Sequence, residues 1–148
     1  ADYRLEAGQP LEVQRRTVTV VEGYWDWEYA ENRGAAFSFL AGQESPWRMP
    51  FLIGVSLLSF VVILYFLRHV KADQRLFIFA LSLIATGAVG NLIDRVRLGY
   101  VIDFILWKAE WGGEMHRWPN FNVADVCISV GATLVFALVL FGEVEETA

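Results

Sequence analysis

Three long apolar runs, separated by short polar stretches, constrain this chain more than any other feature of its sequence. The runs cover residues 51–67, 75–93 and 122–142. Each approaches the roughly 20 apolar residues that an α-helix needs to cross a bilayer core. Hydrophobic residues make up 55% of the 148-residue chain, which is more than an ordinary soluble domain carries. The sequence therefore predicts an α-helical membrane protein, one membrane-embedded domain over 1–148 with transmembrane helices at 50–69, 75–93 and 122–142.

The loop between the first two runs carries three basic residues, Arg68, Lys71 and Arg75. Cytoplasmic loops of membrane proteins are enriched in lysine and arginine, so this loop is predicted to lie in the cytoplasm. The polar ends of the second and third runs then lie together on the extracytoplasmic side. The acidic tail, residues 143–148, returns to the cytoplasm.

The first 42 residues have a different pattern, because aromatic and β-branched side chains alternate with polar ones. Trp25, Trp27 and Tyr29 share one side of a predicted strand, and Asp26 and Glu28 share the other. This period of two is typical of β-strands. We therefore expect a small extracytoplasmic antiparallel β-sheet in 1–42, with its aromatic face toward the lipid headgroups or the helices. The tryptophans near the ends of the apolar runs also favour a position at the membrane–water boundary.

Two similar motifs place an amide one helical turn from a carboxylate: Asn91 with Asp94, and Asn122 with Asp125. A carboxylate near the end of an apolar helix is costly unless it is partnered or hydrated. One interpretation is structural, as helix caps or interfacial polar groups, and Asn122 suits it as a cap. The other is functional, because ionisable groups in membrane segments usually serve a function. For any one of these residues alone the two interpretations carry about equal weight.

A third carboxylate favours the functional interpretation. Asp103 lies within an apolar stretch, Tyr-Val-Ile-Asp-Phe-Ile-Leu, where ionisation is costly and should raise its pKa unless it is paired. It belongs to the same side of the membrane as Asp125. Two aspartates in one apolar setting can share a proton, as aspartic-peptidase chemistry requires. Asp94 and the adjacent Arg95 are interpreted as structural, either an ion pair or a helix-end anchor.

Composition argues against several other classes of protein. The net charge is −5 without a basic face, so nucleic acid is not an expected partner. Cys127 is the single cysteine and cannot form an internal disulfide. His69 and His116 are far apart, and no metal-ligand spacing occurs, so we expect neither a metal nor a cofactor. His116 falls in a polar stretch and is expected to be an exposed loop residue.

Three segments resemble the signature blocks of the lipoprotein signal peptidases, also called signal peptidase II. They are GNLIDRVRLGYVIDFI (Gly90 to Ile105), FNVADVCISVGA (Phe121 to Ala132) and ENRGAAFSFL (Glu31 to Leu40). All three occur in the family's order, and the resemblance covers about Arg16 to Gly142. It implies an intramembrane aspartic endopeptidase of the bacterial cytoplasmic membrane. Such an enzyme removes signal peptides from prolipoproteins before a cysteine that bears diacylglycerol, and the antibiotic globomycin blocks it.

By this resemblance Asp103 and Asp125 match the catalytic aspartates. The other motif positions, which would bind or support the substrate, are Asn32, Gly34, Asn91, Asp94, Arg95, Asn122 and Ala124. The N-terminal sheet is similar to the family's β-cradle, and 98–121 would form an extracytoplasmic loop or lid over the site. The expected partners are the prolipoprotein substrate and membrane lipid, and a monomer is expected.

The family has four transmembrane helices, and the first carries an aspartate–lysine motif that this sequence does not contain. We therefore expect a fragment, a shortened chain or a natural variant. Two functions of another class also remain open. One is a non-catalytic membrane fragment, and the other is a proton-relay or lipid-binding protein with intramembrane acids. A relay would place its acids at several depths, whereas these acids gather at one face.

Overall fold

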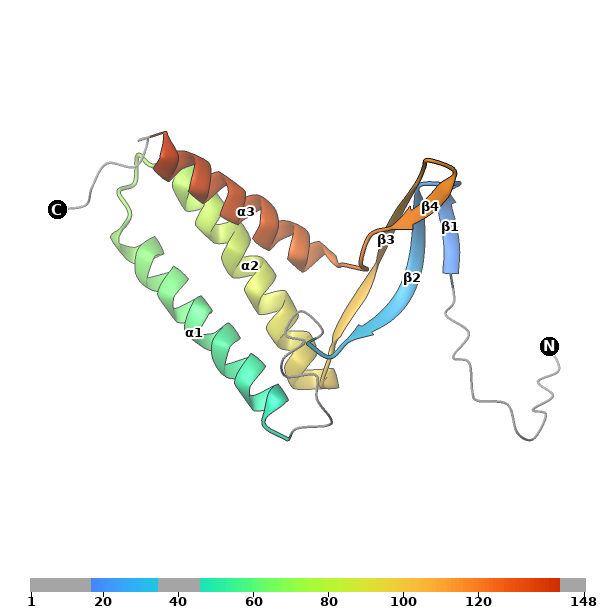
Figure 1. The fold of residues 1–148 in the computed structure, drawn as a ribbon. Helices are drawn as coiled ribbons and strands as arrows, with labels where there is room; N and C mark the ends of the chain where they lie inside the picture. Colours follow the sequence, from blue (N-terminus) through green and yellow to red (C-terminus); the bar gives the residue numbers. More distant parts are fainter. Residues whose placement is uncertain (1–16, 35–45, 142–148) are drawn as a thin grey trace.

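Three helices and one four-stranded sheet make up the computed structural model, which describes residues 17–34 and 46–141 (Figure 1). The strands are β1 (Thr17–Val21), β2 (Trp25–Asn32), β3 (Val101–Trp111) and β4 (Glu114–Arg117). The helices are α1 (Arg48–His69), α2 (Arg75–Leu98) and α3 (Val123–Leu140). Residues 35–40 of the block Glu31 to Leu40, and the acidic tail 143–148, lie outside the described residues. The predicted fold class, apolar helices with a small antiparallel sheet, is confirmed.

All three helices are long and apolar enough to cross a membrane, with hydropathies of 2.5, 2.1 and 2.3. The second differs from its predicted length, because α2 continues beyond Ile93 to Leu98. Polar residues in its last turn do not end the helix. Gly99 ends it, with a left-handed φ of 78° and an amide that donates to the carbonyl of Arg95 at 3.1 Å. The extra turn brings the chain directly to the start of β3.

The four strands follow one another across the sheet in sequence order, each antiparallel to its neighbour. The sequence predicts a loop over 98–121, but most of this segment forms β3 and β4, and His116 lies in β4. Gly112 and Gly113 make the turn between them with φ values of 63° and 82°. Glycine adopts such angles without steric cost, and a glycine pair is a hairpin signal.

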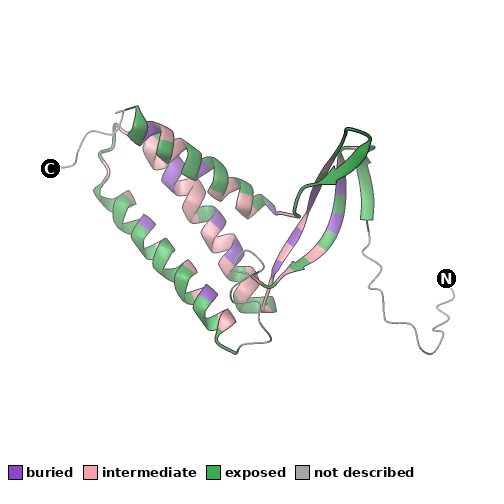
Figure 2. Ribbon diagram, viewed as in Figure 1, coloured by how far each residue is buried: buried purple, intermediate pink, exposed green. Residues whose placement is uncertain are grey.

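The buried side of β2 is its acidic side, which the alternation of residues alone does not reveal. Asp26 and Glu28 are each 3% exposed, whereas Trp27 is 37% exposed. Buried and exposed positions accordingly alternate along β2 (Figure 2). Lys108 forms an ion pair with Asp26, and Arg117 forms one with Glu28. These cross-strand cations cover and neutralise the two carboxylates, which makes burial of the acidic side tolerable.

Glycines allow α2 and α3 to approach so closely that no side chain fits between them. A Cβ atom on Gly87 would lie 2.3 Å from the carbonyl oxygen of Ala124. A Cβ on Gly131 would lie 2.6 Å from the carbonyl oxygen of Ala80. Close backbone contact through small residues is typical of helix pairs in membranes. The contact at Gly87 aligns the polar end of α2 with the first turn of α3.

Candidate active site

Asp103 is the buried carboxylate of the site, and β3 carries it. Its side chain is 3% exposed and both of its oxygens accept amide hydrogen bonds. Nδ2 of Asn32 donates to Oδ2 at 2.9 Å, and Nδ2 of Asn122 donates to Oδ1 at 2.9 Å. Asn32 is the last residue of β2, which pairs with the start of β3. The antiparallel register therefore delivers Asn32 to Asp103, although the two are 71 positions apart.

Asp125 lies in the first turn of α3 and belongs to a capping box. The side chain of Asn122 accepts a hydrogen bond from the backbone N–H of Asp125 at 3.0 Å. In return, the backbone N–H of Asn122 donates to Oδ2 of Asp125 at 3.1 Å. These two bonds satisfy N–H groups that a helix start leaves without partners. Oδ1 of Asp125 accepts a third bond, 2.9 Å from Nδ2 of Asn91.

Asn122 joins the two carboxylates. Its Nδ2 donates to Asp103 and also to Oδ1 of Asn91 at 3.1 Å, while its Oδ1 accepts from the backbone of Asp125. Asn122 and Asn91 are 4% and 7% exposed, so these bonds form away from bulk water. Only an amide offers two donors and an acceptor in this arrangement. Asn122 is thus the cap of α3 that the structural interpretation predicts, and it also donates a hydrogen bond to Asp103.

The electrostatic setting of Asp103 favours its neutral form. Burial is the largest influence and raises its pKa, because the ionised form is poorly solvated there. The hydrogen bond from Asn32 acts in the opposite direction, and the negative charge of Asp125 raises the pKa further. The net shift is upward. Asp125 is thus close enough to Asp103 for the two carboxylates to interact electrostatically.

Two further predicted residues, Asp94 and Arg95, support the site from the last turns of α2. Oδ2 of Asp94 accepts a hydrogen bond of 3.2 Å from the backbone N–H of Ile102, the residue before Asp103. This bond fits the helix-end anchor interpretation, because it ties the start of β3 to α2. Nη1 of Arg95 lies 3.4 Å from Oγ of Ser56 and so connects α2 to α1. The sequence analysis did not identify Ser56.

Gly34 and Ala124 act on the backbone around the dyad. Gly34 has a φ of 96°, and its N–H donates to Oδ1 of Asn32 at 2.9 Å. This bond orients the Asn32 amide so that its nitrogen points at Asp103. Ala124 is the residue whose carbonyl meets Gly87, and its side chain faces Gly90. A larger residue at 124 would move Asp125 away from Asn91.

A cluster of exposed side chains that the sequence analysis missed ties β2 to the start of β3. The hydroxyl groups of Tyr29 and Tyr100 lie 3.0 Å apart, and this hydrogen bond raises the pKa of Tyr29 to about 12. The guanidinium of Arg33 lies 5.6 Å from the centroid of the Tyr100 ring. Arg33 also pairs with Glu31. No local sequence pattern predicts these contacts, because Tyr29 and Tyr100 are far apart in sequence.

Comparison with known proteins identifies the family. The family model described as Signal peptidase (SPase) II matches residues 6–141. The chain belongs to the signal peptidase II family. Lipoprotein signal peptidases of Geobacter metallireducens and Geobacter sulfurreducens are each 48% identical to it over 122 residues. These matches cover 81% of this chain and 70% and 71% of the two relatives. The resemblance seen in the three sequence blocks is thereby confirmed.

Solved structures agree with this assignment to the signal peptidase II family. Two structures described as a bacterial membrane enzyme, determined by the in meso method at 2.3 and 1.9 Å, superpose with TM-scores of 0.69 and 0.68. Both are 29% identical to this chain, cover 86% and 84% of it, and are themselves covered to 72% and 74%. The chain is accordingly a multi-pass bacterial membrane protein of a peptidase family. Within residues 17–34 and 46–141, no cluster of three or more His, Cys, Asp or Glu residues could hold a metal ion.

Proposed function

We propose that this chain is an aspartic endopeptidase that removes the signal peptide from diacylglyceryl-modified prolipoproteins, cutting before the lipid-modified cysteine. The observation that carries the proposal is the bridge made by Asn122. It binds Asp103 through its side chain and Asp125 through its backbone, so two acids from different elements share one polar site. A site with two coupled carboxylates suits hydrolysis by an acid and a base.

In the proposed mechanism, the ionised member of the dyad takes a proton from a water molecule, which attacks the scissile carbonyl carbon. The protonated member donates a hydrogen bond to the carbonyl oxygen and stabilises the charge that develops there. The tetrahedral intermediate then collapses, the C–N bond breaks, and the dyad gives a proton to the leaving amine. Burial raises the pKa of Asp103, which favours it as the member that carries the shared proton.

The surrounding amides and Arg95 have supporting roles in this proposal. Asn32, Asn91 and Asn122 hold the carboxylate oxygens in place, so the acids need no rearrangement as charge moves. Arg95 lowers the cost of negative charge on Asp103 and lies close to the dyad. Asp94, Gly34 and Ala124 position the backbone. Membrane-spanning helices beside the dyad suit a substrate whose lipid chains stay in the bilayer.

The proposed site faces the extracytoplasmic side of the cytoplasmic membrane. The basic loop between α1 and α2 lies at the end of the helices opposite to the sheet (Figure 1). Positive charge favours the cytoplasm for that loop. Asp103 and Asp125 lie at the other end, where substrates emerge after translocation.

The test is cleavage of a purified diacylglyceryl-prolipoprotein by the protein in detergent micelles. Asp103→Asn and Asp125→Asn should each abolish cleavage, because either change removes one of the two acid–base partners. Asp73→Asn is the matched control, since Asp73 is exposed in the cytoplasmic loop, and it should keep wild-type activity. Undiminished cleavage by either dyad variant would refute the assignment.

Two further measurements examine the same proposal. Globomycin should raise the melting temperature of the wild-type protein, and no shift at saturating inhibitor would argue against a formed substrate groove. A chelator should leave cleavage intact, because the dyad supplies both acid and base. Loss of activity with EDTA, restored by added metal, would contradict the mechanism.

A further inference from the structure

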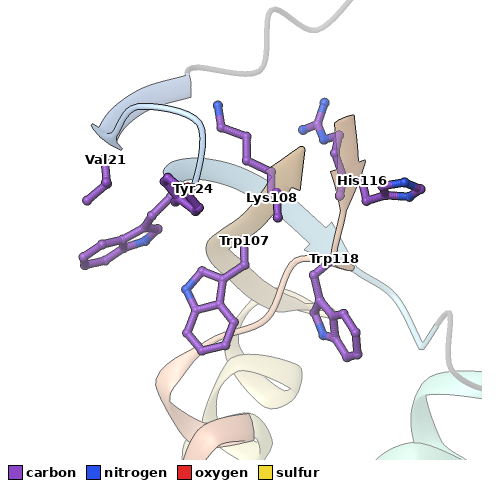
Figure 3. A pocket seen from close by; sticks show the side chains of 9 residues that line it. Val21, Tyr24, Trp107, Lys108, His116 and Trp118 are labelled. Atoms are coloured by element: carbon purple, nitrogen blue, oxygen red, sulfur yellow. The ribbon is translucent and has the colours of Figure 1, made fainter. Parts of the chain in front are cut away.

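The sheet contains a pocket of about 460 Å³ (Figure 3). Neither Asp103 nor Asp125 is among the residues that line it. Tyr24 and Trp25 line it from β2 and the preceding turn, and Trp107 and Trp118 line it from β3 and the segment after β4. Tyr24, Trp107 and Trp118 are 65%, 56% and 67% exposed. A concentration of exposed aromatic rings of this kind marks an interaction surface.

The two sides of the sheet around this pocket differ in chemistry. Trp107 and Trp118 lie on the side of the sheet that the helices occupy, whereas Lys108 points away from the helices (Figure 3). The ring of Trp107 packs edge-on against Phe121, with centroids 5.0 Å apart, and Phe121 directly precedes Asn122, the N-cap of α3. The aromatic surface is therefore in contact with the segment that leads into α3.

The charged side chains of the pocket are positive, and the carboxylates that pair with two of them are buried. Apart from the phenol of Tyr24, its titratable side chains are basic: Lys108, His116 and Arg117. The carboxylates that pair with two of them, Asp26 and Glu28, are each only 3% exposed. Rings toward the helices and cations away from them match a phospholipid, whose hydrocarbon lies deeper than its phosphate.

Trp25 adds an unfilled hydrogen-bonding site. Its Nε1 is buried and has no acceptor within the part of the chain that the structure describes. Indole N–H groups usually find an acceptor when they are buried. The ester and phosphate oxygens of a phospholipid would provide one at the depth where tryptophan prefers to lie.

We infer that this pocket, lined by Trp25, Trp107 and Trp118, binds a phospholipid of the surrounding bilayer and docks the sheet on the membrane surface. Trp107 lies four residues beyond Asp103 on β3, roughly 13 Å along the strand. A lipid held at Trp107 therefore sets the position, relative to the membrane surface, of the strand that carries Asp103. This inference goes beyond the proposed peptidase reaction and does not depend on it.

Quenching of tryptophan fluorescence by brominated lipid tests the inference without any measurement of peptidase activity. The protein is placed in nanodiscs of phosphatidylcholine that is brominated close to its ester groups. Removing a tryptophan that contacts lipid lowers the quenched fraction of the remaining emission, and removing a shielded one raises it. Trp107→Phe and Trp118→Phe should each lower the quenched fraction. An unchanged or increased fraction in both variants would overturn the inference.

A pair of variants on one strand separates the pocket from the strand as a whole. Ala109 lines the pocket, and Glu110 follows it on the opposite side of β3. In detergent micelles, added brominated phosphatidylcholine should quench wild-type protein and Glu110→Phe saturably. Ala109→Phe fills the pocket and should weaken this binding at least several-fold. Equal lipid binding by Ala109→Phe and Glu110→Phe would refute the pocket as the binding site. Loss of quenching as the protein dimerises at higher concentration would also refute it, because a second copy of the chain would then occupy the pocket.

Discussion

The side-chain amide of Asn122 donates a hydrogen bond of 2.9 Å to Oδ1 of Asp103, so the residue that caps α3 also holds a carboxylate on β3. The same residue binds Asp125 through its backbone N–H. The start of α3 and the candidate dyad therefore share the same hydrogen bonds through Asn122. A change that weakens the start of α3 should also disturb the geometry of the two acids.

Replacement of Asn122 should affect stability and catalysis together. Asn122→Ala removes an N-cap, which lowers the free energy of unfolding by about 1 kcal/mol. It also leaves the buried hydrogen-bond partners of Asn122 unpaired, which lowers it by about 1–3 kcal/mol more. We expect a lower melting temperature and strongly reduced prolipoprotein cleavage. Asn122→Asp restores the cap oxygen but removes both donors and adds a third carboxylate, so it should recover part of the stability and none of the activity. Recovery of cleavage by Asn122→Asp would show that the donors are dispensable.

Substitution of Gly87 tests the close approach of α2 and α3. A Cβ there would lie 2.3 Å from a carbonyl oxygen of α3, so Gly87→Ala must separate the helices at an overpacking cost of about 1–3 kcal/mol. The separation lengthens the bond between Asn91 and Asp125, and cleavage should fall. Gly54→Ala is the matched control on α1, where a Cβ meets nothing within 4 Å and helix propensity favours alanine. Thermal unfolding in micelles distinguishes them, and equal melting temperatures would contradict the close contact.

The raised pKa of Asp103 predicts a particular dependence of stability on pH. A carboxyl group whose folded pKa exceeds its unfolded value contributes most stability below the unfolded pKa, near 3.9, and loses it as pH rises through the folded pKa. The melting temperature of wild type minus that of Asp103→Asn should therefore fall as pH rises through this window. A difference that stays constant with pH would show that the pKa of Asp103 is not shifted.

The ion pair between Lys108 and Asp26 should contribute to thermal stability, because Asp26 is buried and its charge needs a partner. The hydrogen bond from Lys108 is the main cause of the lowered pKa of Asp26, so this stabilisation is present above the ordinary carboxyl pKa and is lost as pH falls. At neutral pH, Lys108→Met leaves a buried carboxylate unpaired and should lower the melting temperature. Asp26→Leu with Lys108→Met removes both charges and should be more stable than Lys108→Met alone. If the double variant melts below the single one, the pair does more than neutralise charge.

Much of the architecture follows from local patterns in the sequence. Length and hydropathy define the three spans, and alternation defines β1 and β2, because each pattern has the period of its own element. The candidate residues were also visible, since Asp103 is a lone acid in an apolar stretch and Asn122 stands one turn from Asp125. The hairpin of β3 and β4 differs from the loop that the sequence predicts over 98–121, because its turn at Gly112 and Gly113 lies in a polar stretch without a clear strand period.

The contacts that make a site from these residues depend on tertiary structure. Asn32 and Asp103 meet only because β2 and β3 pair in one antiparallel register, and Asn91 meets Asp125 only because Gly87 lets α2 and α3 touch. A local period determines which side of an element a residue occupies, but not which distant element faces that side. The sequence by itself determined the membrane spans, the acids and the family resemblance. The tertiary structure decided that one amide, Asn122, holds both acids, since that requires a strand, a helix start and a second helix to converge.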